Sequence, residues 1–171
     1  ALFAALTAIG AFLQIPTGTV PITLQFLFTA LAGLLLGWKW GAISQLLYVG
    51  IGLLGLPVFT QGGGIGYVLQ PSFGFLLGLI PAAAVIGAMT ARRIGYLTIL
   101  AAVLVGDLIL YAVGVPYMYL ILHVYMQSAK TFPALLAAML VYVPGDTLKI
   151  IVVTALAPVL RRTLAKAVPN L

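Results

Sequence analysis

The sequence predicts an all-α integral membrane protein with six transmembrane helices, and three observations lead to that fold class. First, 64% of the 171 residues are hydrophobic and only 6% are charged, whereas a soluble domain usually carries about 25% charged residues. Second, the apolar runs are continuous, while a transmembrane β-barrel needs strands that alternate apolar and polar residues. Third, the basic residues stand at the ends of the apolar runs, where they determine topology. We expect a single transmembrane domain over residues 1–171.

The first two helices are expected over residues 1–15 and 24–37. The first is apolar and places Ala4 and Ala8 four positions apart, a spacing of small residues that lets another helix approach closely in a membrane. Residues 16–23 are rich in Gly, Pro and Thr and are expected to form an outer loop. The second helix ends in a Gly-Trp-Lys-Trp-Gly run, whose two Trp residues are typical of a membrane interface.

The third helix, residues 41–56, is rich in Gly and ends at a Pro. Residues 57–71 are too apolar for a free linker and too rich in Gly for a helix. We therefore expect them to form a re-entrant or capping loop over the outer end of the bundle. The fourth helix covers residues 72–90 and ends at a pair of Arg residues.

The fifth helix is expected over residues 95–113. Residues 114–142 contain aromatic and polar side chains and are expected to form an outer loop with interfacial helices. A Pro-Gly pair opens the sixth helix, residues 143–162, and basic residues close it.

Six crossings segregate the basic residues. Lys130 and Lys149 fall toward one side of the membrane. The opposite side receives six cations: Lys39, Arg92, Arg93, Arg161, Arg162 and Lys166. The positive-inside rule makes that side cytoplasmic and places both termini there.

Composition also excludes several functions. The chain has no Cys, so disulfides, thiolate catalysis and Cys-based metal sites are excluded. One His and two acidic residues are too few for an ordinary metal or hydrolase site, so we expect neither a metal nor a cofactor. The basic residues are dispersed at helix ends, which favours membrane lipid over nucleic acid as a partner.

A charged pair in the last helix is the strongest candidate for a functional site. Asp146 and Lys149 lie three residues apart and therefore share a helix face. Charges inside an apolar membrane segment are costly and by default indicate function. With nearby amides and aromatic rings they suit a small, partly apolar ligand that has amide-like groups. The candidate ligand contacts are Asp146, Lys149, Asp107, Tyr111, Gln70, Phe59, Gln61 and Tyr48.

Structural interpretations stay open for several of these residues. Asp146 can be a helix-start carboxylate favoured by the helix dipole, and Lys149 a side chain that extends to the interface. Asp107 can pair with Lys149 instead of touching a ligand. Gln61 and Gln70 can have a plain loop role.

Several ordered motifs resemble those of the BioY family, the biotin-binding S components of energy-coupling factor (ECF) transporters. The motifs are Pro-Ile-Thr-Leu-Gln at 21–25, Leu-Leu-Leu-Gly at 34–37, Gly-Leu-Pro-Val-Phe at 55–59, Gly-Gly-Gly at 62–64 and Pro-Gly-Asp-x-x-Lys at 144–149. Each motif alone is weak, but the ordered set covers nearly the whole chain. One segment departs from the family, because residues 70–74 read Gln-Pro-Ser-Phe-Gly where the family has Gly-Pro-Thr-x-Gly.

The resemblance implies an ECF S-component-like bundle in a prokaryotic cell membrane that captures biotin from outside with high affinity. It also implies a transmembrane coupling subunit and two cytoplasmic ATPase subunits as partners. Ala4 and Ala8 would face the coupling subunit, and Asp146 and Lys149 would contact biotin. The chain itself would be no enzyme, and it contains no Gly-rich nucleotide-binding loop ending in Lys-Ser/Thr.

Three other functions stay open on the sequence. The chain could be an S component for a different vitamin. It could be a stand-alone facilitator, although the inner halves of the helices offer few polar side chains. It could be an intramembrane enzyme, in which Asp107 and Asp146 would have to act as a catalytic pair.

Overall fold

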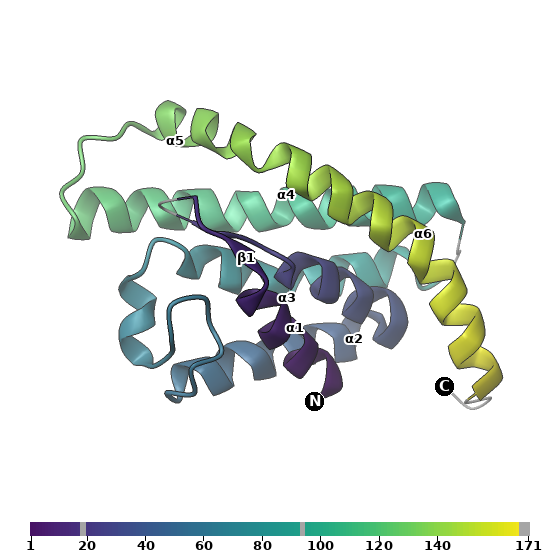
Figure 1. The fold of residues 1–171 in the computed structure, drawn as a ribbon. Helices are drawn as coiled ribbons and strands as arrows, with labels where there is room; N and C mark the ends of the chain where they lie inside the picture. The colour runs from purple at the N-terminus through teal and green to yellow at the C-terminus, as the bar shows by residue number, and fades with distance from the viewer. Residues whose placement is uncertain (18–19, 93–94, 168–171) are drawn as a thin grey trace.

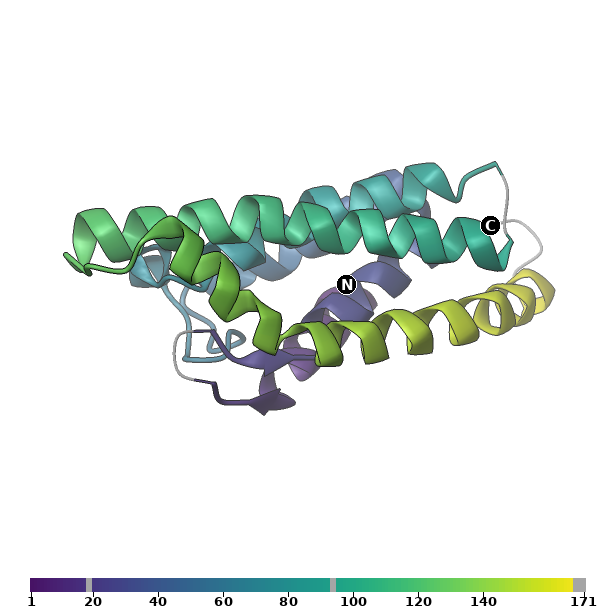
Figure 2. The same cartoon turned by 90° about the horizontal axis from the view of Figure 1, so that it is seen from above.

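Apolar helices packed side by side make up most of the molecule (Figures 1 and 2). The computed structural model describes residues 1–17, 20–92 and 95–167. Within them three helical stretches are long and apolar enough to cross a membrane, and three shorter apolar helices accompany them. The helices are α1 (Leu2–Phe12), α2 (Gln25–Leu53), α3 (Phe73–Met89), α4 (Tyr96–Leu120), α5 (Phe132–Ala138) and α6 (Val143–Ala167). The predicted all-α membrane fold is confirmed.

The long element α2 is in fact two antiparallel helices that reverse at Gly37. Gly37 has φ 79° and ψ 178°, a conformation that residues with a side chain rarely adopt. Beyond the reversal the halves touch, since a Cβ added to Gly41 would lie 2.9 Å from the Cα of Gly33. Farther along, Thr29 Oγ1 and Gln45 Oε1 are 3.0 Å apart. The second and third helices were expected to be separate, and they correspond to the two helices on either side of Gly37.

The first helix is shorter than expected, because residues 14 and 15 form a strand instead. Strand β1 (Gln14–Ile15) pairs antiparallel with β2 (Ile22–Thr23). Pro16 accounts for the difference, since proline disfavours the helical conformation in the residue before it. The expected loop 16–23 is therefore the turn and second strand of a hairpin, and its residues 18 and 19 lie outside the described residues.

The fifth helix was expected to end at residue 113, and that end is wrong, so the outer connection expected over residues 114–142 begins only after residue 125. Helix α4 continues past residue 113 to Leu120 and runs into a π-helix, Ile121–Tyr125. Gly114 does not end the helix because it serves close packing, and a Cβ there would lie 2.4 Å from the Phe75 ring. After a short connection follow α5 and a 3₁₀-helix, Met139–Val141. The last helix also exceeds its expected end at residue 162.

One end of the bundle, here called the basic end, brings together the reversal of α2, the end of α3 and the later part of α6. A Cβ on Gly87 would lie 2.4 Å from the backbone nitrogen of Trp38. Arg161 Nη1 donates to the carbonyl of Thr90 at 3.5 Å. The three segments therefore meet at this end.

The cations expected on the cytoplasmic side gather at the basic end as far as the structure describes them. Lys39 follows the α2 reversal, Arg92 follows α3, and Arg161 lies on α6. Arg93 lies outside the described residues, as do the side chains of Arg162 and Lys166. The cytoplasmic orientation of this end and of both termini stays a prediction.

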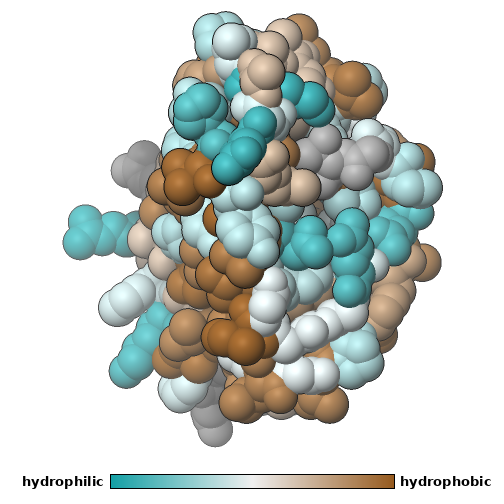
Figure 3. All heavy atoms as spheres, turned by 90° about the vertical axis from the view of Figure 1, so that its left-hand side faces the viewer, coloured by the Kyte–Doolittle hydropathy of each residue, from teal (hydrophilic) through white to brown (hydrophobic). Residues whose placement is uncertain are grey.

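The opposite end, here called the hairpin end, carries the β1–β2 hairpin and a capping segment over residues 54–72. That segment contains a Phe59–Gly62 bridge and a 3₁₀-helix, Ile65–Leu69. Figure 3, which looks along the bundle from the left of Figure 1, shows hydrophilic residues among hydrophobic ones on this side. At about 1.5 Å per residue, α1 spans only about 16 Å of a hydrocarbon core about 30 Å thick. The hairpin and the capping segment contribute lining residues to a cavity at this end.

Candidate ligand-binding site

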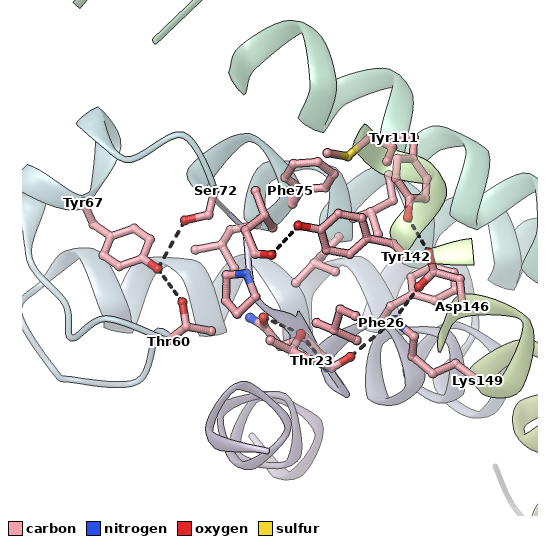
Figure 4. A pocket seen from close by; sticks show the side chains of 18 residues that line it. Thr23, Phe26, Thr60, Tyr67, Ser72, Phe75, Tyr111, Tyr142, Asp146 and Lys149 are labelled. Carbon is pink, nitrogen blue, oxygen red and sulfur yellow. Dashed lines mark hydrogen bonds and ion pairs between the residues drawn. The ribbon is translucent and has the colours of Figure 1, made fainter. Parts of the chain in front are cut away.

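The cavity lies near the hairpin end and has a volume of about 70 Å³. Its walls come from β2, the start of α2, and the facing sides of α3, α4 and α6, with Tyr67 of the capping segment at its edge (Figure 4). The apolar part of the wall consists mainly of Phe26, Phe75, Leu76, Leu79 and Leu110. The polar part comes from several elements, and its two charged side chains, Asp146 and Lys149, both lie on α6.

An ion pair forms the polar centre of this wall. Asp146 Oδ1 and Lys149 Nζ are 2.5 Å apart, and both residues are buried, with 6% and 8% of their surface exposed. Tyr111 on α4 donates its hydroxyl hydrogen to Asp146 Oδ2. Lys149 Nζ also donates to the carbonyl of Thr23 at 3.3 Å. The pair therefore links α4, α6 and the hairpin.

Two sets of hydroxyl contacts involve the hairpin and the capping segment (Figure 4). The Tyr142 hydroxyl donates to the carbonyl of Val20 at 2.5 Å and lies 2.9 Å from Thr17 Oγ1. The Tyr67 hydroxyl lies 2.8 Å from Thr60 Oγ1 and 3.4 Å from Ser72 Oγ. The first set joins the hairpin to Tyr142, the residue before α6. The second joins residues within the capping segment, up to Ser72 directly before α3.

Three of the predicted ligand contacts come together at the cavity: Asp146, Lys149 and Tyr111. Their convergence follows from the helical spacing of the pair and from Tyr111 facing α6. Gln25, the last residue of the 21–25 motif, lines the cavity as well.

Two predicted contacts are buried behind the cavity wall. Tyr48 accepts a hydrogen bond from Gln25 Nε2 at 2.8 Å and donates to the carbonyl of Val58 at 3.0 Å. Phe59 packs edge-on against Tyr48, with ring centroids 5.5 Å apart. In this structure both residues support Gln25 and the capping segment, and neither lines the cavity.

The remaining predicted contacts lie elsewhere. Gln61 and Gln70 are exposed on the capping segment. Asp107 lies on α4 and is absent from the cavity wall. It does not form the ion pair with Lys149 that was the structural alternative, since Lys149 pairs with Asp146.

The two small residues expected to face a partner lie on the inner side of α1. Ala4 is 5% exposed and belongs to the core of this chain. Ala8 lies at the margin of the core and keeps part of its surface exposed. Only Ala8 of the two is thus accessible in this structure.

Sequence reasoning missed Tyr142 as a cavity residue. It precedes Asp146 by four positions and Lys149 by seven, so helical spacing alone could have placed it on the same face. The backbone carbonyl of Thr23, in contrast, has no signal in the sequence.

The fold and the cavity define a class: a multi-pass helical membrane protein with a small, partly polar cavity near one face. The BioY family profile matches residues 1–166, and the chain belongs to the BioY family. It is accordingly a multi-pass protein of the cell membrane.

Named relatives agree with this membership. The chain is 56% identical to a protein of Lysinibacillus sphaericus named "Probable biotin transporter BioY", over 77% of this chain and 68% of the relative. It is 37% identical to the "Biotin transporter BioY" of Rhodobacter capsulatus, over 99% and 92% of the two chains. A crystal structure of the S-component for biotin from an ECF-type ABC transporter matches with a TM-score of 0.82 at 31% identity, covering 95% of this chain and 88% of that one.

Proposed function

We propose that this chain is the biotin-binding S component of an ECF-type transporter. The observation that carries the proposal is the buried cluster of Asp146, Lys149 and Tyr111 at a cavity in a member of this family. A charged pair inside an apolar bundle is costly and indicates a functional site. The printed names of the relatives and of the solved structure support biotin as the ligand.

The chemistry of the cavity suits the parts of biotin. The ureido group has two N–H donors and a carbonyl, which the Asp146 carboxylate and the Lys149 ammonium complement from one helix face. Phe75, Leu76 and Leu79 offer an apolar surface for the sulfur-containing ring. The valerate carboxylate requires a donor, and Lys149 and the hydroxyl of Tyr142 are the candidates at the wall.

Binding requires the cavity to expand. Pockets for small molecules usually enclose about 300–1,000 Å³, against about 70 Å³ here. Hydroxyl contacts of Tyr142 and Tyr67 hold the hairpin and the capping segment over the cavity. Tyr48 and Tyr117 also donate to backbone carbonyls of the capping segment. We infer that biotin enters by displacing them and is then enclosed beneath them.

Import would depend on partners. The proposed complex adds a transmembrane coupling subunit and two cytoplasmic ATPase subunits, because this chain has no nucleotide-binding loop of the Walker type. The apolar outer face of α1, with Leu2, Ile9 and Phe12 exposed, is available for contact with the coupling subunit or lipid.

Calorimetry on the purified protein in detergent tests the proposal. We expect one biotin to bind per chain, and thiamine and riboflavin to give no signal. Binding of another vitamin without biotin would overturn the substrate while leaving the S-component class intact.

A further inference from the structure

The chain has two acidic residues, Asp107 and Asp146. Asp107 is not among the proposed ligand contacts. It lies on the flank of α4 that also carries Tyr111, one turn farther along. Its Oδ1 atom is buried and has no hydrogen-bond partner among the described residues. A buried polar atom without a partner is uncommon and requires an explanation.

The groups around Asp107 leave it without a counter-ion. Asp107 lies one helical turn from Tyr111, whose hydroxyl contacts Asp146 on α6. The Lys149 ammonium is already engaged by Asp146 and the Thr23 carbonyl. On α4 itself, the Tyr111 hydroxyl is directed at Asp146. Helix α3, which packs against α4, and the short α5 contain no titratable side chain.

The charge of the cluster follows from this arrangement. With Asp146 and Lys149 neutralising each other, an ionised Asp107 would give the cluster a net charge of −1. The unpaired carboxylate, which is partly buried, would repel the carboxylate of an incoming ligand more strongly than it would in bulk water. A neutral Asp107 leaves a cluster of zero net charge.

We propose that Asp107 carries a proton when the site is occupied, and that this proton lets the cavity accept a monoanionic ligand. Asp107 is then a specificity residue that acts on the charge of the site without touching the ligand. The inference rests on the proposed function, since the anionic ligand meant here is biotin.

The proposal predicts that biotin binding takes up a proton when Asp107 is ionised beforehand. Affinity for biotin should therefore fall as pH rises, by up to about tenfold per pH unit once Asp107 ionises in the free protein. The ligand carboxylate stays ionised throughout, because an unperturbed carboxyl group titrates near about pH 4. Biotinamide, which is neutral, should show a much weaker dependence.

The experiment measures the Kd of biotin by calorimetry between about pH 6 and about pH 9, in buffers of different ionisation enthalpy that report proton uptake. Asp107→Asn, which mimics the protonated carboxyl, should bind biotin with nearly constant affinity and without proton uptake. His123→Gln removes the only histidine, which is exposed beyond α4, and should keep the wild-type dependence. If Lys149 were the titrating group, Asp107→Asn would keep the dependence as well.

Each result decides. Constant wild-type affinity over this range, or an unchanged slope in Asp107→Asn, overturns the role of Asp107 while biotin binding upholds the proposed function. Affinity that responds to sodium in place of protons also overturns it, in favour of a bound cation. Absence of biotin binding at every pH overturns both proposals. An infrared band of a protonated carboxylic acid in the biotin-bound protein, lost in Asp107→Asn, supports the assignment independently of affinity.

Discussion

Asp146 Oδ1 and Lys149 Nζ lie 2.5 Å apart on one face of α6, buried beneath the hairpin. Removing either partner leaves the other as an uncompensated buried charge, which costs about 3–5 kcal/mol in comparable pairs. The pair also supplies the charged groups of the proposed biotin site. Its integrity therefore bears on folding and on binding at once.

Asp146→Ala and Lys149→Ala should each weaken biotin binding by roughly 10²- to 4 × 10³-fold, in line with a loss of about 3–5 kcal/mol. Calorimetry gives the affinity, and thermal unfolding in detergent shows how much stability is lost. Lys130→Ala is the matched control, because Lys130 is exposed and outside the cavity. Wild-type affinity in both variants would remove the pair from the site.

The sequence could predict this pair because its geometry is local. Three residues of helix fix the relative direction of Asp146 and Lys149 wherever the helix lies. The depth of Asp107 along its helix was predictable for the same reason. Whether Asp107 reaches the cavity wall as Tyr111 does depends on how α4 packs, and spacing in the sequence does not contain that information.

The aromatic residues also show that sequence spacing does not reveal which side chains the packing of the chain brings to the cavity. Tyr111, Tyr48 and Phe59 were equally plausible as ligand contacts from composition. Only Tyr111 lines the cavity, because the capping segment folds back and buries Phe59 against Tyr48. Gly114 was misleading in another way, since a glycine that serves close packing inside a helix resembles one that ends it.

A disulfide between the hairpin and α6 should prevent biotin from binding. Gly145 lies directly against Ile22, with a Cβ position 3.3 Å from Ile22 Cγ2. The natural chain has no Cys, so Ile22→Cys with Gly145→Cys offers one defined pair. Because the cavity must expand to admit biotin, the oxidised protein should bind at least about tenfold more slowly or more weakly.

Reduction of this disulfide should restore binding, and each single Cys variant should bind normally in both redox states. Stopped-flow fluorescence or surface plasmon resonance gives the association rate. An oxidised, fully cross-linked protein that binds at the wild-type rate would show that biotin enters by another route. A disulfide that cross-links the capping segment would then be the next test.

Gly33→Ala should destabilise the protein, whereas Gly50→Ala should not. A Cβ at position 33 would lie 2.5 Å from the carbonyl oxygen of Ala83 on α3, so the two helices would have to separate. Overpacking of this kind typically costs about 1–3 kcal/mol. Gly50 has no neighbour within 4 Å of its Cβ position, and alanine there favours the helix. Thermal unfolding of the two variants gives the comparison, and equal unfolding temperatures would contradict the close contact of α2 with α3.

The partner surface of α1 can be located by enlarging one alanine at a time. Ala8→Leu should reduce co-purification with the coupling subunit and leave biotin binding unchanged, because Ala8 is partly exposed and does not line the cavity. The reason is steric, since small residues permit close helix approach in membranes and a larger side chain prevents it. Quantitative co-purification from membranes that contain all subunits provides the measurement.

Two further variants show which face of α1 contacts the coupling subunit. Ala4→Leu should destabilise the chain itself, because Ala4 is already packed in its core at 5% exposure, and a loss of coupling in that variant would therefore be indirect. Ala5→Leu places the same bulk on the exposed side of α1. If Ala5→Leu loses the coupling subunit while Ala8→Leu retains it, the partner binds the outer face that carries Leu2 and Ile9, and the predicted role of the Ala4–Ala8 spacing is packing within this chain.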